Sequence, residues 1–197
     1  MQLTRRAAAL ILSAGLALAA TSASAADKAP RVKFTTSVGD FVVEVYPDKA
    51  PKTVENFLTY VKAGFYNGTV FHRVIGHFMI QGGGYQQDFR QKITRPPIPY
   101  EGAAIKAAGG PGNTEGTIAM ARTSDPNSAT SQFFINVADN SRLDDAPGKP
   151  GYAAFGKVVS GMDTVNKIKA VATGAGGPFP TDVPKTPVVI QSATLEQ

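Results

Sequence analysis

Short segments in which hydrophobic and polar residues alternate recur along the chain from residue 32 onward. Residues 32–36 and 40–45 alternate with a period of two on either side of a turn at residues 37–39, which predicts an antiparallel hairpin. Six further apolar segments have the length of strands, at residues 70–74, 78–81, 116–121, 132–137, 153–159 and 188–195. Because many short strands separated by loops rich in Gly, Pro, Asn and Asp are typical of an antiparallel barrel or sandwich, the pattern predicts a mainly β protein.

Two segments have the hydrophobic period of a helix. In residues 50–63 the apolar positions that share one face are Val54, Phe57, Leu58 and Val61. Pro51 suits the first turn of this helix, and Gly64 suits its C-terminal cap. Residues 161–171 have the second helical pattern. Residues 85–114 are rich in Pro and Gly, and we expect them to form an extended loop without secondary structure of its own.

The N-terminus has the organisation of a secretory signal peptide. Two arginines form a positive n-region, residues 7–20 are apolar, and Ala23-Ser24-Ala25 fits a cleavage site. The apolar segment is shorter than the roughly 20 residues that span a bilayer, so cleavage is favoured over a retained membrane anchor. The arginine pair also suggests twin-arginine export, although the general secretory route fits better. We therefore expect a cleaved signal peptide at residues 1–25 and a single mature domain at residues 26–197.

Composition and charge argue against several classes of function. The chain has no cysteine, so it forms neither disulfides nor thiolate zinc sites. Its two histidines, His72 and His77, lack the spacing of metal ligands, and the sequence has no Gly-x-Ser-x-Gly motif of a hydrolase. The net charge is +5, but the lysines and arginines are scattered and form no run that would follow a phosphate backbone. We therefore expect no metal, no cofactor and no nucleic-acid partner.

The most informative segment is residues 71–83, Phe-His-Arg-Val-Ile-Gly-His-Phe-Met-Ile-Gln-Gly-Gly. Strand alternation predicts that four of its side chains share one face, namely those of Phe71, Arg73, Met79 and Gln81. A guanidinium and an amide on an apolar wall suit an apolar ligand with a polar backbone, such as a peptide that contains proline. The segments Met120-Ala121-Arg122 and Ser131-Gln132-Phe133-Phe134-Ile135-Asn136 have the same character.

Together these segments resemble the cyclophilin family of peptidyl-prolyl cis-trans isomerases, particularly its exported bacterial type. The resemblance extends from about residue 32 to residue 195, which is nearly the whole mature chain. It implies a closed eight-stranded antiparallel β-barrel with an α-helix covering each end. It also implies a periplasmic enzyme without a cofactor that accelerates the rotation of X–Pro bonds in unfolded or flexible polypeptides. We expect such a protein to be a monomer.

The resemblance also assigns roles to individual residues. The catalytic residues would be Arg73 and Gln81. The proline ring would lie among Phe78, Met79, Phe134 and Leu143, and Gln132 would hold the peptide backbone or fix the arginine. Ala121, Arg122 and Thr123 would run alongside the substrate and contact it through their main chain. Tyr152 stands where many relatives have a histidine, and its aromatic face and hydroxyl would preserve the pocket.

Arginine suits this reaction because of the way in which an X–Pro bond rotates. Amide resonance gives the bond a barrier of about 18–20 kcal/mol. An N–H donor aimed at the prolyl nitrogen weakens that resonance and binds best when the amide is twisted, without a covalent step. Arg73 is the candidate donor, and the alternative is that Arg73 forms a surface ion pair. The apolar residues also fit ordinary barrel core, and Gln81 and Gln132 also fit hydrogen-bonded strand amides.

Two other functions stay open at this point. A similar barrel could bind proline-containing peptides as a chaperone or scaffold without catalysis. It could also carry a small hydrophobic ligand, although its inward positions are bulky enough to fill a small barrel.

One departure from the family concerns Arg142, because many cyclophilins have a tryptophan at this position. Arginine lacks the flat apolar wall and single N–H of an indole, so we expect weak binding of cyclosporin.

Overall fold

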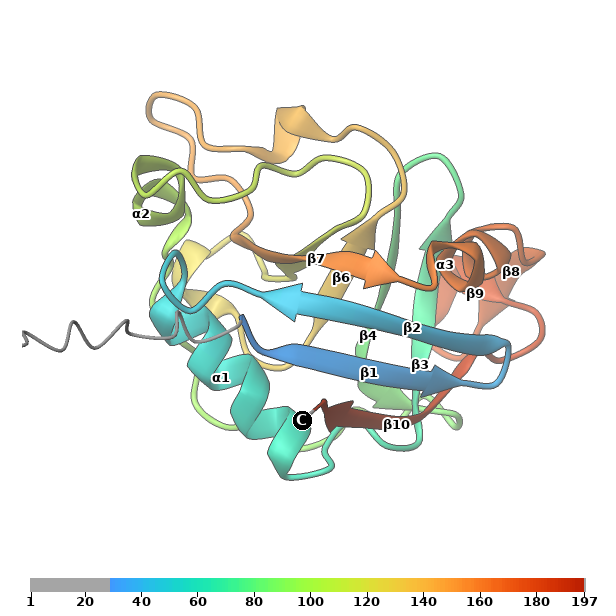
Figure 1. The fold of residues 1–197 in the computed structure, drawn as a ribbon. Coiled ribbons are helices and arrows are strands. Elements are labelled where there is room, and N and C mark those ends of the chain that lie inside the picture. Colours follow the sequence, from blue (N-terminus) through green and yellow to red (C-terminus); the bar gives the residue numbers. More distant parts are fainter. Residues whose placement is uncertain (1–28, 197) are drawn as a thin grey trace, which may run out of the picture.

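The computed structural model describes residues 29–196, and eight of its strands close into a barrel (Figure 1). Around the barrel the order is β1, β10, β3, β4, β6, β5, β7, β2, and each neighbouring pair is antiparallel. The strands are β1 (Arg31–Thr36), β2 (Gly39–Val45), β3 (Thr69–Ile75), β4 (Met79–Gln86), β5 (Thr117–Met120), β6 (Phe133–Asn136), β7 (Ala154–Ser160) and β10 (Val189–Leu195). Each predicted strand segment forms one of them, so the predicted closed antiparallel barrel is confirmed.

Aromatic side chains fill the interior of the barrel. Phe34 of β1 and Phe41 of β2 stack with their ring centroids 4.9 Å apart, and Phe133 of β6 lies 5.4 Å from Phe34. Phe71 of β3 and Phe155 of β7 are buried in the same core. These rings meet because successive side chains of a strand point to opposite faces, so each strand directs alternate apolar residues inward. The interior is a packed core, which argues against a barrel that carries a hydrophobic ligand.

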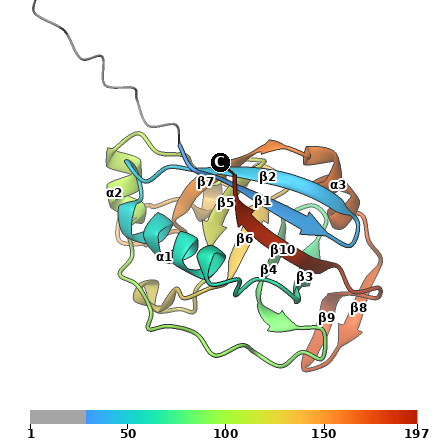
Figure 2. The same cartoon turned by 60° about the horizontal axis from the view of Figure 1, so that its bottom comes forward.

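Two helices, α1 (Pro51–Lys62) and α3 (Met162–Lys169), lie at opposite ends of the barrel (Figures 1 and 2). Their buried apolar residues are Val54, Phe57 and Val61 in α1, and Val165 and Ile168 in α3. Both helices were predicted from the hydrophobic period, and their ends differ from the prediction by only one or two residues. The apolar face of each helix therefore contributes to the same core as the strands.

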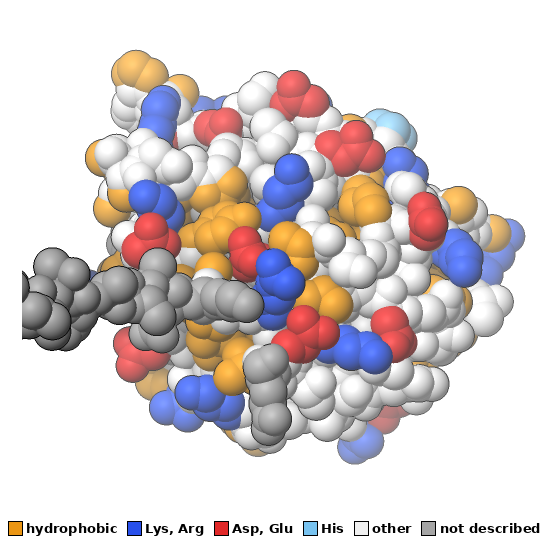
Figure 3. All heavy atoms as spheres, viewed as in Figure 1, with side chains coloured by type: hydrophobic (Ala, Val, Ile, Leu, Met, Phe, Trp, Pro, Cys, Tyr) orange, Lys and Arg blue, Asp and Glu red, His pale blue; other side chains and the backbone are white. Residues whose placement is uncertain are grey.

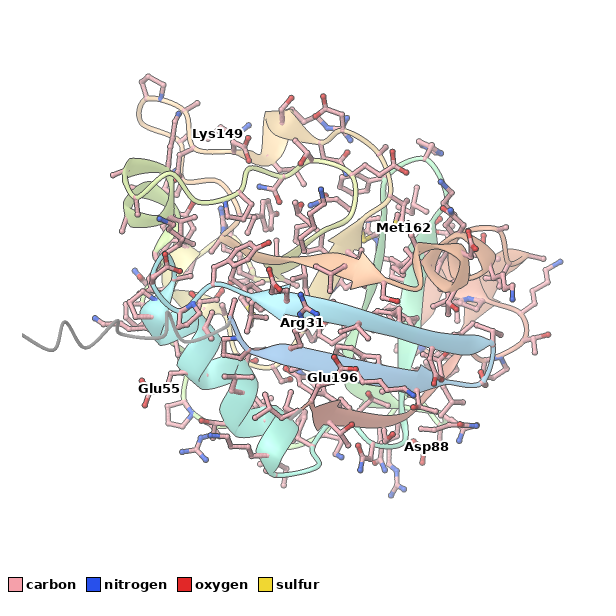
Figure 4. The ribbon with its side chains drawn as sticks, viewed as in Figure 1. Arg31, Glu55, Asp88, Lys149, Met162 and Glu196 are labelled. Atoms are coloured by element: carbon pink, nitrogen blue, oxygen red, sulfur yellow. The ribbon has the colours of Figure 1, made fainter. Side chains whose placement is uncertain are left out.

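A distant carboxylate caps the first turn of α1, the turn before Glu55 in Figure 4. Glu101 accepts hydrogen bonds from the main-chain N–H of Lys52 at 3.1 Å and from the main-chain N–H and hydroxyl of Thr53, both at 2.7 Å. A negative charge at this end of a helix is favourable because the first N–H groups have no partner within the helix. Glu101 therefore joins the long loop after β4 to one end of the barrel.

The structure differs from the sequence prediction within residues 85–114, which contain a short helix, α2 (Gly102–Ala107). The expectation of a loop without secondary structure is wrong here, because Ala and Lys favour helical backbone and Ile105 is buried in the core. A second unpredicted element is the hairpin of β8 (Thr173–Gly176) and β9 (Phe179–Pro184), which contacts β3 and is separate from the barrel sheet. Its glycine-rich sequence shows no clear period of two.

The surface carries charges of both signs. Acidic and basic side chains are interspersed on the face that Figure 3 shows. In residues 29–196, no helix combines the length and the apolar character needed to cross a membrane. The predicted signal peptide lies outside the residues that the structure describes, so its presence and cleavage stay predictions.

Candidate active site

One surface cavity of about 290 Å³ brings together most of the residues that the sequence predicts as a site. Its lining consists of Arg73, Phe78, Met79, Gln81, Ala121, Arg122, Phe134, Leu143 and Tyr152. These residues come from β3, β4 and β6 and from the loops next to those strands. Two predicted residues, Thr123 and Gln132, are not part of the lining. We refer to this cavity as the groove.

Arg73 reaches the groove because β3 contains a bulge at His72. In the pairing of β3 with β4, Phe71 is opposite Gly82. Arg73 is opposite Gln81, the preceding residue of β4, so His72 is an extra residue on β3. Phe71 therefore points into the barrel core, where it is 1% exposed, whereas Arg73 points outward. The predicted shared face of Phe71 and Arg73 is wrong, because simple alternation does not account for a bulge.

The floor of the groove is a small apolar cluster that is separate from the barrel core. Met79 and Phe134 are 2% and 3% exposed, and they pack with Ala119 and Ala154. Partly buried residues pack against this cluster, namely Ile75, Phe78, Ala121, Leu143 and Tyr152. Phe133 belongs to the barrel core, as expected for the neighbour of Phe134 on a strand. The groove therefore has an apolar floor of its own, suited to a small ring.

Two glutamine side chains are joined at the edge of the groove. The Nε2 of Gln81 donates a hydrogen bond to the Oε1 of Gln132 at 3.0 Å. Gln132 lies against the backbone at Gly84, where a Cβ would be 2.5 Å from the Gln132 Cγ. Gln132 thus lies next to Gln81, outside the groove lining, and its hydrogen bond orients the Gln81 side chain that lines the groove.

The guanidinium of Arg73 is available to a ligand. The side chain is exposed at the groove, and it forms no hydrogen bond or ion pair with any residue between 29 and 196. Two other arginines do form surface ion pairs, Arg31 with Glu44 and Arg90 with Asp88. The alternative in which Arg73 is a surface ion-pair residue therefore has no support within the described part of the chain.

The side chain of Arg122 is bound to main chain instead. Its guanidinium donates to the carbonyl oxygens of Pro150 at 2.8 Å, Gly151 at 2.9 and 3.1 Å, and Thr123 at 2.8 Å. It also lies 4.6 Å from the centroid of the Tyr152 ring. Because its donors are used in this way, the Arg122 side chain positions the residues before β7 and the Tyr152 ring that lines the groove.

Comparison with known proteins identifies the family. The family model described as "Cyclophilin type peptidyl-prolyl cis-trans isomerase/CLD" matches residues 31–195. The chain belongs to the cyclophilin family. It is 52% identical over 173 residues to "Peptidyl-prolyl cis-trans isomerase A" of Dickeya dadantii, with 88% of each chain covered. It is also 52% identical over 169 residues to "Peptidyl-prolyl cis-trans isomerase B" of Escherichia coli, which covers 84% of this chain and 99% of that protein. The chain is therefore a peptidyl-prolyl cis-trans isomerase.

Solved cyclophilin structures have the same fold. A crystal structure of a cyclophilin-type isomerase of Cryptosporidium parvum matches with a TM-score of 0.65 at 24% identity, covering 86% of this chain and 98% of that chain. A crystal structure described as the same isomerase in the presence of the dipeptide Ala-Pro matches with a TM-score of 0.64 at 25% identity, covering 85% and 99%. The predicted cyclophilin barrel is thus confirmed by comparison as well as by strand order.

Two polar residues that the sequence does not predict, Tyr100 and Asp145, hold the main chain next to the cyclophilin groove. The hydroxyl of Tyr100 donates to Asp145 Oδ1 at 2.7 Å, and the same oxygen accepts from the Gly151 N–H at 2.7 Å. Burial, together with the hydrogen bond to the Asp145 carboxylate, raises the pKa of Tyr100 well above its usual value. The hydroxyl therefore stays protonated and helps to hold Gly151, which also binds Arg122. No local pattern indicates a pair that is 45 residues apart in the chain.

A buried asparagine fixes two predicted pocket residues of the cyclophilin. The Nδ2 of Asn140 donates to the carbonyl of Phe78 at 2.7 Å and to Asn136 Oδ1 at 2.8 Å. The main-chain carbonyl of Asn140 accepts from the Leu143 N–H at 2.7 Å. Phe78 and Leu143 are therefore held by the same residue, although they are far apart in sequence. The sequence shows Asn140 only as one polar residue of a loop, so this role could not be predicted.

Neither histidine of this cyclophilin lines the groove. His72 is 3% exposed and lies 4.6 Å from the ring of Tyr85 and 5.5 Å from the ring of Phe179 on β9. Burial lowers the pKa of His72 to about 4, and the neighbouring charge of Arg73 adds to this effect. His77 is exposed in the turn between β3 and β4. His72 is thus a neutral packing residue at physiological pH.

Proposed function

We propose that the mature protein, residues 26–197, accelerates the rotation of X–Pro bonds in exported proteins as they fold in the periplasm. The N-terminal pattern of a basic region, an apolar segment and a small-residue cleavage site supports the location. The absence of cysteine is compatible with an oxidising compartment. The substrates are unfolded or flexible segments that contain proline, and the enzyme acts as a monomer without a cofactor.

In this proposal Arg73 stabilises the twisted amide. As the X–Pro bond rotates, the lone pair of the prolyl nitrogen localises and becomes a better hydrogen-bond acceptor. A guanidinium N–H aimed at this nitrogen therefore binds the transition state more tightly than either planar isomer. Arg73 suits the role because it is always charged, lines the groove, and has no partner in the part of the chain that the structure describes. No covalent bond to the substrate is made, and no proton is transferred.

The remaining groove residues hold the substrate during rotation. The proline ring lies on the apolar floor, against Phe78, Met79, Phe134 and Leu143, with Tyr152 beside it. Gln81, oriented by Gln132, binds a peptide carbonyl. The main chain of residues 121–123 follows the substrate, while the Arg122 side chain holds the loop before β7. The ring is therefore fixed while the preceding residue turns about the amide bond.

The observation that carries the proposal is the guanidinium of Arg73, which has no partner within residues 29–196 and lies beside an apolar floor formed by Met79 and Phe134. The test is a protease-coupled assay in which residues 26–197 are mixed with a short X–Pro peptide. Uncatalysed cis-to-trans conversion takes tens of seconds or longer, so a rate that rises with enzyme concentration is easily distinguished. Conversion at the uncatalysed rate at every enzyme concentration would refute the proposal.

A further inference from the structure

A second arginine lies at the rim of the groove and, like Arg73, has no partner in the described part of the chain. Arg142 lies in the short 3-10 turn Ser141–Leu143. The next residue, Leu143, lines the groove. Its guanidinium carbon is 5.0 Å from the centroid of the Phe78 ring, which also lines the groove. The side chain is exposed, and among residues 29–196 it forms neither a hydrogen bond nor an ion pair. Stacking on Phe78 therefore holds a positive charge beside the ring pocket.

The acidic residues next to Arg142 in the chain make other contacts. Asp139 Oδ1 accepts a hydrogen bond from the Ser141 N–H at 3.0 Å. Asp144 Oδ1 accepts from the main-chain N–H and the Nδ2 of Asn113, at 2.7 and 2.8 Å. Neither carboxylate lies within ion-pair distance of Arg142. The charge of Arg142 is therefore not neutralised by its neighbours.

The groove itself also has an excess of positive charge. Its lining includes Arg73 and Arg122 and contains no Asp or Glu. Arg122 uses its donors on main-chain carbonyls, and Arg73 is assigned to the prolyl nitrogen. Arg142 is thus an arginine at the groove that has no partner among residues 29–196 and no assigned contact with the rotating amide. A carboxylate of the substrate is the group that complements it.

We propose that Arg142 is a specificity-determining residue that makes the enzyme favour X–Pro segments with Asp or Glu within two residues of the proline. This inference rests on the proposed function, since it requires the proline ring to lie beside Phe78. Successive Cα atoms are about 3.8 Å apart, so a carboxylate one or two residues from the proline can reach a guanidinium stacked on Phe78. The attraction is the same in the planar and twisted states, so it lowers KM and leaves kcat nearly unchanged.

The test compares peptides that differ only by Glu or Gln, placed at each of the two positions before and the two positions after the proline. At low ionic strength we expect kcat/KM to be about two- to five-fold higher for Glu than for Gln at one or more positions, mainly through KM. Arg142→Gln should bring this ratio close to one, and Arg142→Lys should retain most of it. Lys185→Gln removes the same charge from an exposed residue after β9 and should leave the ratio unchanged.

The Glu-to-Gln ratio is taken within each variant, so a general change in activity cancels. A ratio of one at all four positions in the unmodified enzyme would overturn the inference, as would a ratio that survives Arg142→Gln. If no peptide is isomerised, the proposed function fails independently. In that case the affinities of the Glu and Gln peptides are measured by fluorescence anisotropy. The inference then requires tighter binding of the Glu peptide to the unmodified protein and equal binding of both peptides to Arg142→Gln.

Discussion

The guanidinium of Arg122 lies 4.6 Å from the centroid of the Tyr152 ring, and the same guanidinium binds the carbonyl of the residue before Tyr152. The Tyr152 ring in turn meets the ring of Phe134 edge-on, with centroids 5.6 Å apart. Arg122 thus holds a wall of the groove without presenting its own donors to the substrate. Its side chain is a positioning group, whereas that of Arg73 has no partner among residues 29–196 and is the donor that we propose for the reacting amide.

We therefore predict that Arg122→Ala destabilises the protein and widens the groove. Loss of its hydrogen bonds to main chain should lower the free energy of unfolding by about 1–2 kcal/mol, measured by urea denaturation. The KM for an X–Pro peptide should rise more than kcat falls, because the wall is lost and Arg73 is kept. Arg122→Lys preserves the charge but not the planar fork, so it should behave almost like Arg122→Ala. Full stability in both variants would contradict the positioning role.

The catalytic assignment leads to a different result for Arg73→Ala. Removing a charge-assisted hydrogen bond that tightens in the transition state should cost about 2–4 kcal/mol, or roughly 30- to 1000-fold in kcat/KM. The variant should keep its unfolding free energy, because Arg73 has no partner in residues 29–196. It should also keep its affinity for a proline-containing peptide, because the Arg73 hydrogen bond tightens only as the amide twists. Arg90→Ala, which removes an exposed arginine paired with Asp88, is the matched control. Near-full activity of Arg73→Ala would eliminate the mechanism.

The strands of the barrel could be predicted from sequence because each one is a short alternating or apolar segment bounded by loop residues. Phe34 and Phe41, for example, are both at inward positions of an obvious hairpin, and they stack in the core. Closure of the sheet depends on pairing between distant strands, such as β1 with β10, which periodicity does not encode. That part of the prediction came from the resemblance to cyclophilins.

The site residues that lie within one short motif could be predicted from the sequence. The contacts that join distant segments of the chain could not. Arg73, Met79 and Gln81 lie in one hairpin and were found together. The bulge at His72 was missed because an extra residue leaves no mark on the alternation of a short strand. The support from Asn140 was missed because hydrogen bonds between distant residues have no sequence period.

Burial of His72 predicts a specific loss of stability in acid. Its folded-state pKa, about 4, is below the ordinary value of 6.5, so between these values only the unfolded state takes up the proton. The free energy of unfolding should therefore fall as pH decreases from 6.5 to 4, by about 1.4 kcal/mol per pH unit. His72→Phe keeps an aromatic ring against Tyr85 and Phe179 and should remove this part of the pH dependence.

The measurement for His72 is urea denaturation at several pH values, comparing the unmodified protein with the variant. His77→Gln is the control, since His77 is exposed and its substitution should leave the pH dependence unchanged. Equal pH dependence in the unmodified protein and His72→Phe would show that folding does not lower the pKa of His72. Should His72→Phe fold poorly, titration of the His72 ring by NMR gives the same answer directly.

Arg142 also predicts a weak response to cyclosporin. An apolar cyclic peptide would meet a guanidinium stacked on Phe78 where many cyclophilins present an indole. Arg142→Trp should strengthen inhibition by roughly tenfold, because an aromatic anchor in a partly desolvated position contributes on the order of 1 kcal/mol or more. Inhibition constants from the isomerase assay measure this difference, with Arg142→Gln separating loss of charge from gain of the ring. Tight inhibition of the unmodified enzyme would show that Arg142 does not occupy the tryptophan position.

The proposed periplasmic location predicts the N-terminus of the mature protein. The apolar segment of residues 7–20 ends shortly before Ala23-Ser24-Ala25, so cleavage should leave Ala26 as the first residue. An isomerase needs no cofactor inserted before export, and passage as an unfolded chain is therefore sufficient. The measurement is N-terminal sequencing of the protein from periplasmic and membrane fractions of the producing cell, with Ala25→Arg, which should block cleavage, as a control. A protein that begins at Met1 in the membrane fraction would mean that the apolar segment is retained as an anchor.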